Sequence, residues 1–88
     1  MRFKTAQLLF YDGAPLAEIV YVDARGAPVL FCIIDSGGAE SQARSETRGD
    51  LSLTSWSNGG RGYLVVGRLP ERKTADLARM LESRFSKS

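Results

Sequence analysis

The stretch LSLTSWSNGGRGYLVVGRLPE, residues 51–71, decides the fold of this 88-residue chain. Its first part, 51–56, alternates leucines with Ser52, Thr54 and Trp56, which is typical of a half-buried strand. The second part, 63–67, is an apolar run of strand length, and Asn58-Gly59 stands between the two. Because a tight hairpin turn needs positive φ, Asn-Gly in this position predicts an antiparallel hairpin of strands 51–56 and 63–67.

A helix is predicted directly after this hairpin, from about residue 71 to residue 85. Pro70 suits the first turn of a helix, where no backbone N–H is lost, and Glu71 complements the helix N-terminus. An apolar stripe follows at helical spacing, and we expect it to lie on the sheet. The stripe consists of Leu77, Leu81 and Phe85, flanked by Ala78 and Met80.

Three further strands are predicted in the first half of the chain, at 5–11, 16–22 and 29–34. Apolar, aromatic and β-branched residues dominate all three runs, and turn-forming residues separate them. The run V-L-F-C-I-I at 29–34 is unbroken, which predicts a central strand covered on both faces. Its Cys32 is then a small buried apolar residue rather than a reactive thiol.

Residues 35–50 differ in character from the rest, because 35–49 contain no large apolar side chain. The segment predicts a long polar loop, either a segment that contacts a partner or a tolerated surface insertion. The chain therefore predicts one α+β domain, 1–88, in which an antiparallel sheet of about five strands packs on one C-terminal helix in two layers.

Composition narrows the classes of function. There is no histidine, which removes the commonest general base and most zinc ligation, and the one cysteine cannot form an internal disulfide. The net charge of +2 divides into −2 for residues 1–60 and +4 from Arg61 onward. In the predicted helix, bases and acids alternate at neighbour spacings, as in Arg72 and Asp76, so we expect a solvated face and no direct nucleic-acid binding.

The segment Gly62–Arg68 approaches the spacing of a phosphate-binding P-loop, but its residues are unsuited to that role. The four positions between its glycines are stiff strand formers, an arginine replaces the lysine, and Leu69 replaces the hydroxyl residue that would hold magnesium. We expect no cofactor site, no metal site and no catalytic constellation in this chain.

Four carboxylates, Asp12, Glu18, Asp23 and Asp35, lie near predicted turns or strand ends. Two converging carboxylates could serve as acid and base in a hydrolase, so this class stays open as a weaker alternative. Their spacing gives no sign of convergence, and aspartates are common in turns for local hydrogen-bonding reasons.

The tip of the predicted hairpin and the polar segment supply the candidate partner contacts. An exposed Trp56 beside a base would form a binding patch, whereas a Trp56 under the helix would close the core, and core burial is the favoured interpretation. The candidate contact residues are Trp56, Asn58, Arg61 and Tyr63 at the hairpin and Arg44 and Arg48 in the polar segment.

Three segments carry a resemblance to a known family. They are AQLLFYDGAPLAEIVYVDARGAPVLFC (6–32), LTSWSNGGRGYLVVGRLPE (53–71) and ADLARML (75–81). In order along the chain they give a strand with Y-x-D-x-x-G-x-P-V, a tryptophan before a glycine-rich turn, and G-x-L-P-E at the start of a helix. This order resembles that of the C-terminal extracytoplasmic domain of bacterial transmembrane anti-sigma factors. The likeness covers nearly the whole chain, and its motifs are structural.

The resemblance implies a non-enzymatic regulatory or sensor domain that contributes to the control of transcription initiation in response to an envelope or ligand signal. A sigma factor would be bound only through an N-terminal region that this sequence lacks, and the membrane only through a missing transmembrane helix. The domain would lie on the extracytoplasmic face of the inner membrane if tethered, or in the cytoplasm if its parent has no membrane helix. The alternative is a free-standing small binding module, which could be a homodimer.

Overall fold

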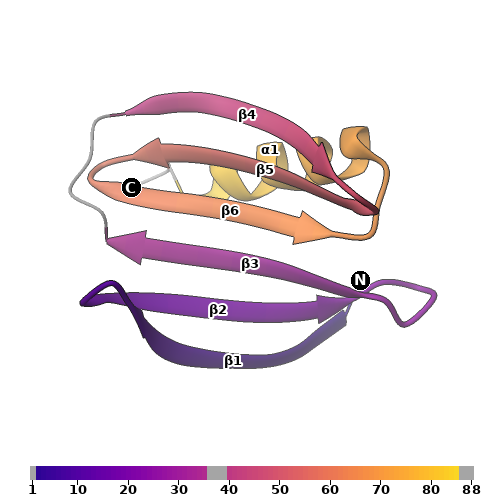
Figure 1. The fold of residues 1–88 in the computed structure, drawn as a ribbon, viewed down its shortest axis with the longest axis horizontal. Coiled ribbons are helices and arrows are strands. Elements are labelled where there is room, and N and C mark those ends of the chain that lie inside the picture. The colour runs from indigo at the N-terminus through magenta and orange to yellow at the C-terminus, as the bar shows by residue number, and fades with distance from the viewer. Residues whose placement is uncertain (1, 36–39, 86–88) are drawn as a thin grey trace.

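The computed structural model describes residues 2–35 and 40–85, which form a six-stranded antiparallel sheet and one helix (Figure 1). The α+β fold and its single C-terminal helix confirm the expectation from sequence, with six strands in place of about five. The elements are β1 (Arg2–Tyr11), β2 (Ala14–Val22), β3 (Pro28–Asp35), β4 (Ser41–Arg48), β5 (Leu51–Asn58), β6 (Arg61–Gly67) and α1 (Glu71–Phe85).

The additional strand is β4, and it corrects the prediction of a long loop at 35–50. Residues 36–39 of that segment lie outside the described residues, but Ser41–Arg48 pair with β5 along their length. Every side chain of β4 is exposed, because the strand forms an edge of the sheet. An exposed edge strand needs backbone pairing but no apolar face, so its sequence lacks the pattern that identified the other strands.

The sheet order is β1-β2-β3-β6-β5-β4, so two three-stranded meanders meet where β3 pairs with β6. The β5–β6 hairpin forms, but its central turn residues are Gly59 and Gly60, at φ 62° and 80°, and the Asn58 of the predicted Asn-Gly turn is the last residue of β5. Positive φ at both central positions is the type I′ turn, whose twist matches that of the strands.

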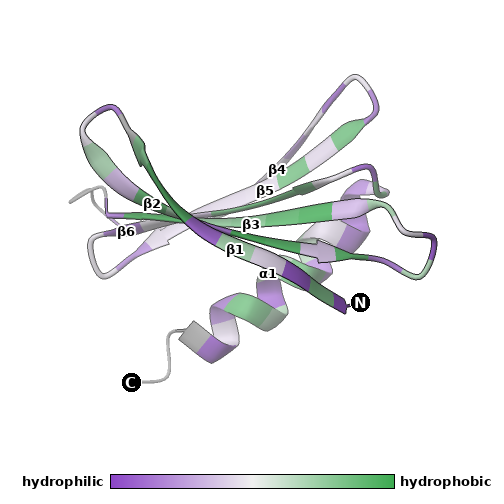
Figure 2. Ribbon diagram, turned by 90° about the horizontal axis from the view of Figure 1, so that it is seen from below, coloured by the Kyte–Doolittle hydropathy of each residue, from purple (hydrophilic) through white to green (hydrophobic). Residues whose placement is uncertain are grey.

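The two faces of the sheet have different surroundings. We call the face on which α1 packs the helix-side face and the opposite one the open face (Figure 2). Antiparallel register and alternation assign every strand residue to one of them. One row of paired residues on the helix-side face is Ala6, Ile19, Phe31, Val65, Thr54 and Ser45, in sheet order.

The core lies between α1 and the helix-side face of β3, β5 and β6. Its buried apolar residues are Val29, Phe31, Trp56, Tyr63, Val65 and Ala78. The helix contacts the sheet mainly through small residues, since Thr74 and Ala78 are 0% and 1% exposed. The face of α1 that meets the sheet is therefore rotated from the predicted leucine stripe, because Leu77 and Leu81 only flank the core and Met80 is 49% exposed. The side chain of Phe85 lies outside the described part.

Hydroxyl groups join α1 to the sheet inside this core. Ser52 Oγ donates to the backbone oxygen of Leu69 at 2.6 Å, and Thr54 Oγ1 donates to Thr74 Oγ1 at 3.3 Å. Thr74 Oγ1 in turn donates to the backbone oxygen of Glu71 at 2.9 Å. These bonds satisfy polar groups that would otherwise be costly to bury.

The prediction that the 29–34 strand is covered on both faces is wrong. β3 is central in the sheet, but only Val29, Phe31 and Ile33 point to the helix-side face. The alternate residues, Leu30, Cys32 and Ile34, lie on the open face and are half-buried by their neighbours in the sheet alone. A continuous apolar run reports two apolar faces, and it does not say that both are covered within one chain.

Candidate interaction surfaces

The helix-side face is covered over only part of its width. Helix α1 contacts β4, β5 and β6, and it leaves β1 and β2 uncovered (Figure 1). The most exposed large apolar side chains of the described residues lie there: Phe3, Leu8 and Phe10 are 62%, 66% and 75% exposed. Their partners Tyr21, Ala17 and Pro15 lie on this same face, and Phe3 shares the face with Leu8 and Phe10 because the register of β1 shifts between Phe3 and Thr5. Contiguous exposed apolar surface of this kind marks an interaction site.

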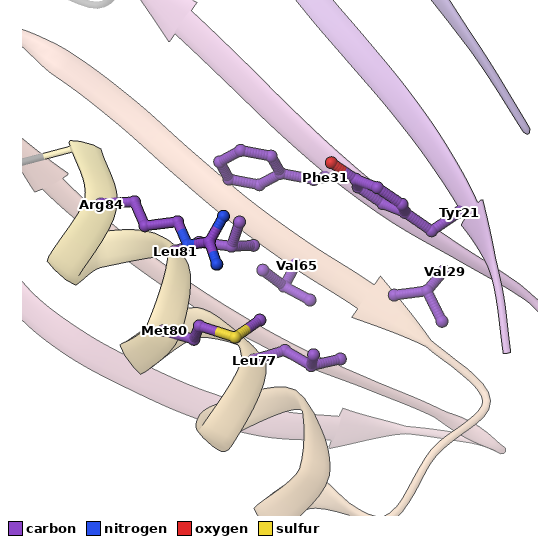
Figure 3. Close-up of a pocket in the computed structure, with 8 residues that line it drawn as sticks. All are labelled: Tyr21, Val29, Phe31, Val65, Leu77, Met80, Leu81 and Arg84. Atoms are coloured by element: carbon purple, nitrogen blue, oxygen red, sulfur yellow. The ribbon is translucent and has the colours of Figure 1, made fainter. Parts of the chain in front are cut away.

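A groove of about 190 Å³ lies where this uncovered surface meets the helix. Figure 3 shows its two walls, with side chains from the second half of α1 on one side and from the strands on the other. The lining residues are Tyr21, Val29, Phe31, Val65, Leu77, Met80, Leu81 and Arg84. We call this groove, together with the exposed side chains of β1, the helix-side groove.

The floor of the helix-side groove is rigidly built. The rings of Phe31 and Tyr63 stack with centroids 6.2 Å apart, and those of Trp56 and Tyr63 with centroids 5.1 Å apart. At the outer side, Phe3 meets the ring of Tyr21 edge-on at 6.2 Å. Aromatic pairs in such arrangements contribute beyond their buried area, so these rings help to hold Phe31 and Tyr21 in place in the groove.

The open face is also apolar. Its central strands present Leu16, Val20, Leu30, Cys32, Ile34, Leu53, Leu64 and Val66, all half-buried. Burial raises the pKa of the Cys32 thiol, and the negative charge of Glu18 beside it raises that pKa further. Both effects disfavour the thiolate, so Cys32 is an apolar group of this surface rather than a nucleophile.

The six residues proposed from sequence as partner contacts do not form one patch. Trp56 and Tyr63 pair with each other in the core at 3% and 7% exposure, which agrees with the core interpretation of Trp56. Asn58 and Arg61 flank the hairpin turn, where Arg61 is exposed.

The remaining two candidates, Arg44 and Arg48, lie on the open-face side of β4. Arg48 Nη2 contacts Glu46 Oε1 at 3.3 Å in an exposed ion pair. Such pairs contribute little to stability, so these bases remain available to a partner.

The four carboxylates of the hydrolase alternative are distributed over different parts of the sheet. Asp12 is in the β1–β2 turn, Asp35 ends β3, and Glu18 lies on the open face, where its Oε1 accepts a bond of 2.7 Å from Gln7 Nε2. Asp23 begins the β2–β3 connection at the other end of β2. Within residues 2–35 and 40–85, no cluster of three or more His, Cys, Asp or Glu side chains could hold a metal ion.

Asp23 has a structural role that accounts for its position. Its Oδ1 accepts hydrogen bonds of 2.9 Å from the backbone N–H groups of Arg25 and Ala27. The bond from Ala27 is the main cause that lowers the pKa of Asp23, with the Arg25 N–H and charge adding to it and desolvation opposing it. The carboxylate thus holds the loop that joins β2 to β3.

Sequence reasoning missed the exposed apolar residues Phe3, Leu8 and Phe10. Leu8 and Phe10 belong to the apolar run of the first predicted strand, 5–11, but Phe3 lies outside it, and the run does not show that this strand forms an edge beyond the reach of the helix. No helix in the described part of the chain is long and apolar enough to cross a bilayer. A scan against protein-family models and searches of curated proteins and of solved structures find no match to this chain.

Proposed function

We propose that this chain is a non-enzymatic regulatory domain that binds an amphipathic helix of a partner protein in the helix-side groove. The observation that carries the proposal is the apolar surface of β1 and β2, which continues into the groove beside α1. A domain that used all its apolar surface for folding would not leave Phe3, Leu8 and Phe10 more than 60% exposed on one face.

The width of the uncovered surface fits one helix. Two strands at a spacing of about 4.8 Å extend across roughly 10 Å, which compares with about 10 Å for a helix with its side chains. Leu77, Met80 and Leu81 of α1 supply the second wall that a neighbouring helix would contact. Helices that pack side by side in this way lie 8–10 Å apart.

The polar groups of the groove specify the chemistry of the partner. Arg84 is exposed at its rim and carries a guanidinium group that favours a carboxylate. The bound helix would therefore present apolar residues at i, i+3, i+4 and i+7 and an acidic side chain towards Arg84.

The resemblance to the extracytoplasmic domains of anti-sigma factors supports a regulatory role for this binding. In that arrangement a separate region of the parent protein holds the sigma factor, and the domain described here receives the signal. Occupation of the groove by a helix would couple the signal to sigma-factor release.

A titration with a synthetic helix tests the groove. A peptide of about 15 residues with a leucine stripe and one glutamate should shift amide resonances of β1, β2 and the second half of α1 in two-dimensional NMR spectra. The variant Leu8→Asp should weaken this binding, whereas Leu64→Asp, on the open face, serves as the matched control and should not. Resonance shifts confined to β4 and β5, or equal binding by both variants, would exclude the groove as the site.

A reporter experiment tests the regulatory role. The substitution Leu8→Asp, placed in the parent gene, should change transcription from a promoter that depends on the cognate sigma factor. Unchanged reporter activity, with unchanged protein abundance, would contradict the role in transcription while leaving the groove itself intact.

A further inference from the structure

We propose that the open face is the interface of a symmetric homodimer, in which two copies of this chain pack sheet against sheet. The inference concerns the side of the sheet opposite the helix-side groove, and it does not rest on the proposed function. In the dimer the layers would be helix, sheet, sheet and helix, so that each sheet becomes covered on both faces.

The composition of the open face is that of an interface with an apolar centre and a polar rim. The four central strands, β2, β3, β6 and β5, present the eight apolar side chains named above. At one margin lies the hydrogen-bonded pair of Gln7 and Glu18, and at the other lie Arg44, Glu46 and Arg48 of β4. Stable protein interfaces have this arrangement, with charged residues depleted from the centre.

The size of the face agrees with that of a stable dimer. Six strands about 4.8 Å apart and seven to ten residues long at about 3.3 Å per residue give a face of roughly 800 Å². Interfaces of standard size bury about 800 Å² on each partner. Two sheets of this size can pack face to face about 10 Å apart with their strands within about 30° of each other.

The charges of the open face are self-complementary. One row of paired residues crosses this face in the order Gln7, Glu18, Cys32, Leu64, Ser55 and Arg44. The acid Glu18 on β2 and the base Arg44 on β4 thus lie on opposite sides of the centre of the sheet, four strand positions apart.

A two-fold axis parallel to the strands, between β3 and β6, would make use of this row. It lays β4 of one copy over β1 of the other, so that Arg44 of the partner subunit approaches the pair of Gln7 and Glu18. An axis perpendicular to the strands that passes through this row would instead oppose Arg44 to its own copy, which like charges disfavour. The row therefore selects the parallel axis and favours a second copy of this chain as the occupant.

Sedimentation over a dilution series of the whole chain tests the interface. The wild-type protein should dimerise, and Leu64→Asp should raise the dissociation constant about 100-fold, as expected for the loss of a central contact. Leu8→Asp, on the other face, is the matched control and should leave dimerisation unchanged. A monomer at every concentration, or a dimer insensitive to Leu64→Asp, such as one formed through sheet edges, overturns the proposal.

A charge exchange tests the symmetry without disturbing the apolar centre. Glu18→Arg and Arg44→Glu should each weaken the dimer several-fold, and the double variant should restore it. The two positions are about 19 Å apart within one copy, beyond the range of a screened interaction, so restoration reports contact between copies. If the double variant instead weakens the dimer by the sum of the two single losses, the proposed axis is wrong.

Discussion

The two halves of the sheet differ in what covers them, although each is a three-stranded meander. On the helix-side face of β4, β5 and β6, the most deeply buried residues include Ser52 and Thr54, at 2% and 1% exposure. On the same face of β1, Phe3, Leu8 and Phe10 are exposed. The more apolar half is thus the more exposed one.

This difference teaches that position relative to the helix, more than hydrophobicity, decides burial in this domain. Only three residues, Arg68, Leu69 and Pro70, join β6 to α1, so the short connection places the helix over the strands nearest to it. The apolar residues of β1 lie beyond its reach. Since they contribute little to folding, we infer that they serve binding.

The largest expected effect comes from making the same substitution in the covered and in the uncovered part of the helix-side face. Phe31→Ala removes a ring that is 1% exposed from the covered core and should lower the free energy of unfolding by about 3–5 kcal/mol. Phe10→Ala, the matched control at 75% exposure, should change it by no more than about 0.5 kcal/mol. Urea denaturation measures both values, and similar losses for the two variants would remove the distinction between the covered and the uncovered part.

A smaller effect is expected from crowding the contact between α1 and the sheet. Ala78 is 1% exposed under the helix, so Ala78→Leu would force the helix away from the sheet and destabilise by about 1–3 kcal/mol. Met80→Leu, at an exposed position of the same helix, is the control. Thermal unfolding compares them, and an Ala78→Leu variant as stable as the wild type would mean that the helix is held loosely.

The buried hydroxyl network should contribute less. Thr54→Val keeps the shape of the side chain but removes the bonds of 3.3 Å to Thr74 Oγ1 and 2.7 Å to Ser45 Oγ. We expect a loss of about 1 kcal/mol, because Thr74 retains its bond to the backbone of Glu71 and Ser45 can turn to solvent. Urea denaturation measures the free energy of unfolding of both proteins. A Thr54→Val variant at least as stable as the wild type would mean that the network is dispensable.

The smallest effect concerns pH and the loop between β2 and β3. Because folding lowers the pKa of Asp23, its contribution to stability is present above the ordinary aspartate pKa and is lost as pH falls through the lowered value. Unfolding by urea at neutral and at acidic pH should show a smaller pH dependence for Asp23→Ala than for the wild type. An equal dependence in both proteins would mean that the loop does not need the charge.

Much of the fold was predictable from local patterns. The glycines after Asn58 and the alternation at 51–56 predicted the hairpin, although the turn lies at Gly59-Gly60. The Pro70-Glu71 start predicted a helix whose bounds agree with α1. The strand β4 was missed because an exposed edge strand carries no apolar pattern, so Ser41–Arg48 read as a loop.

The candidate surfaces were less predictable, because they depend on which face the helix covers. The alternation at 51–56 alone left both faces of this strand open, and only the favoured core burial of Trp56 pointed to the serine and threonine side as the one under α1. Likewise, the run 29–34 gave two apolar faces of β3 without revealing that one of them is open. The order of strands in the sheet supplies that information, and pattern within a single segment does not contain it.

The account depends most on the claim that the uncovered half of the helix-side face binds a helix. Urea denaturation of the wild-type protein with and without the amphipathic peptide tests it most directly. At a peptide concentration about 100 times its dissociation constant, the account predicts a gain of about 2.7 kcal/mol in the free energy of unfolding, and a much smaller gain for Leu8→Asp at the same peptide concentration. No gain for the wild type, or an equal gain for both proteins, would contradict it.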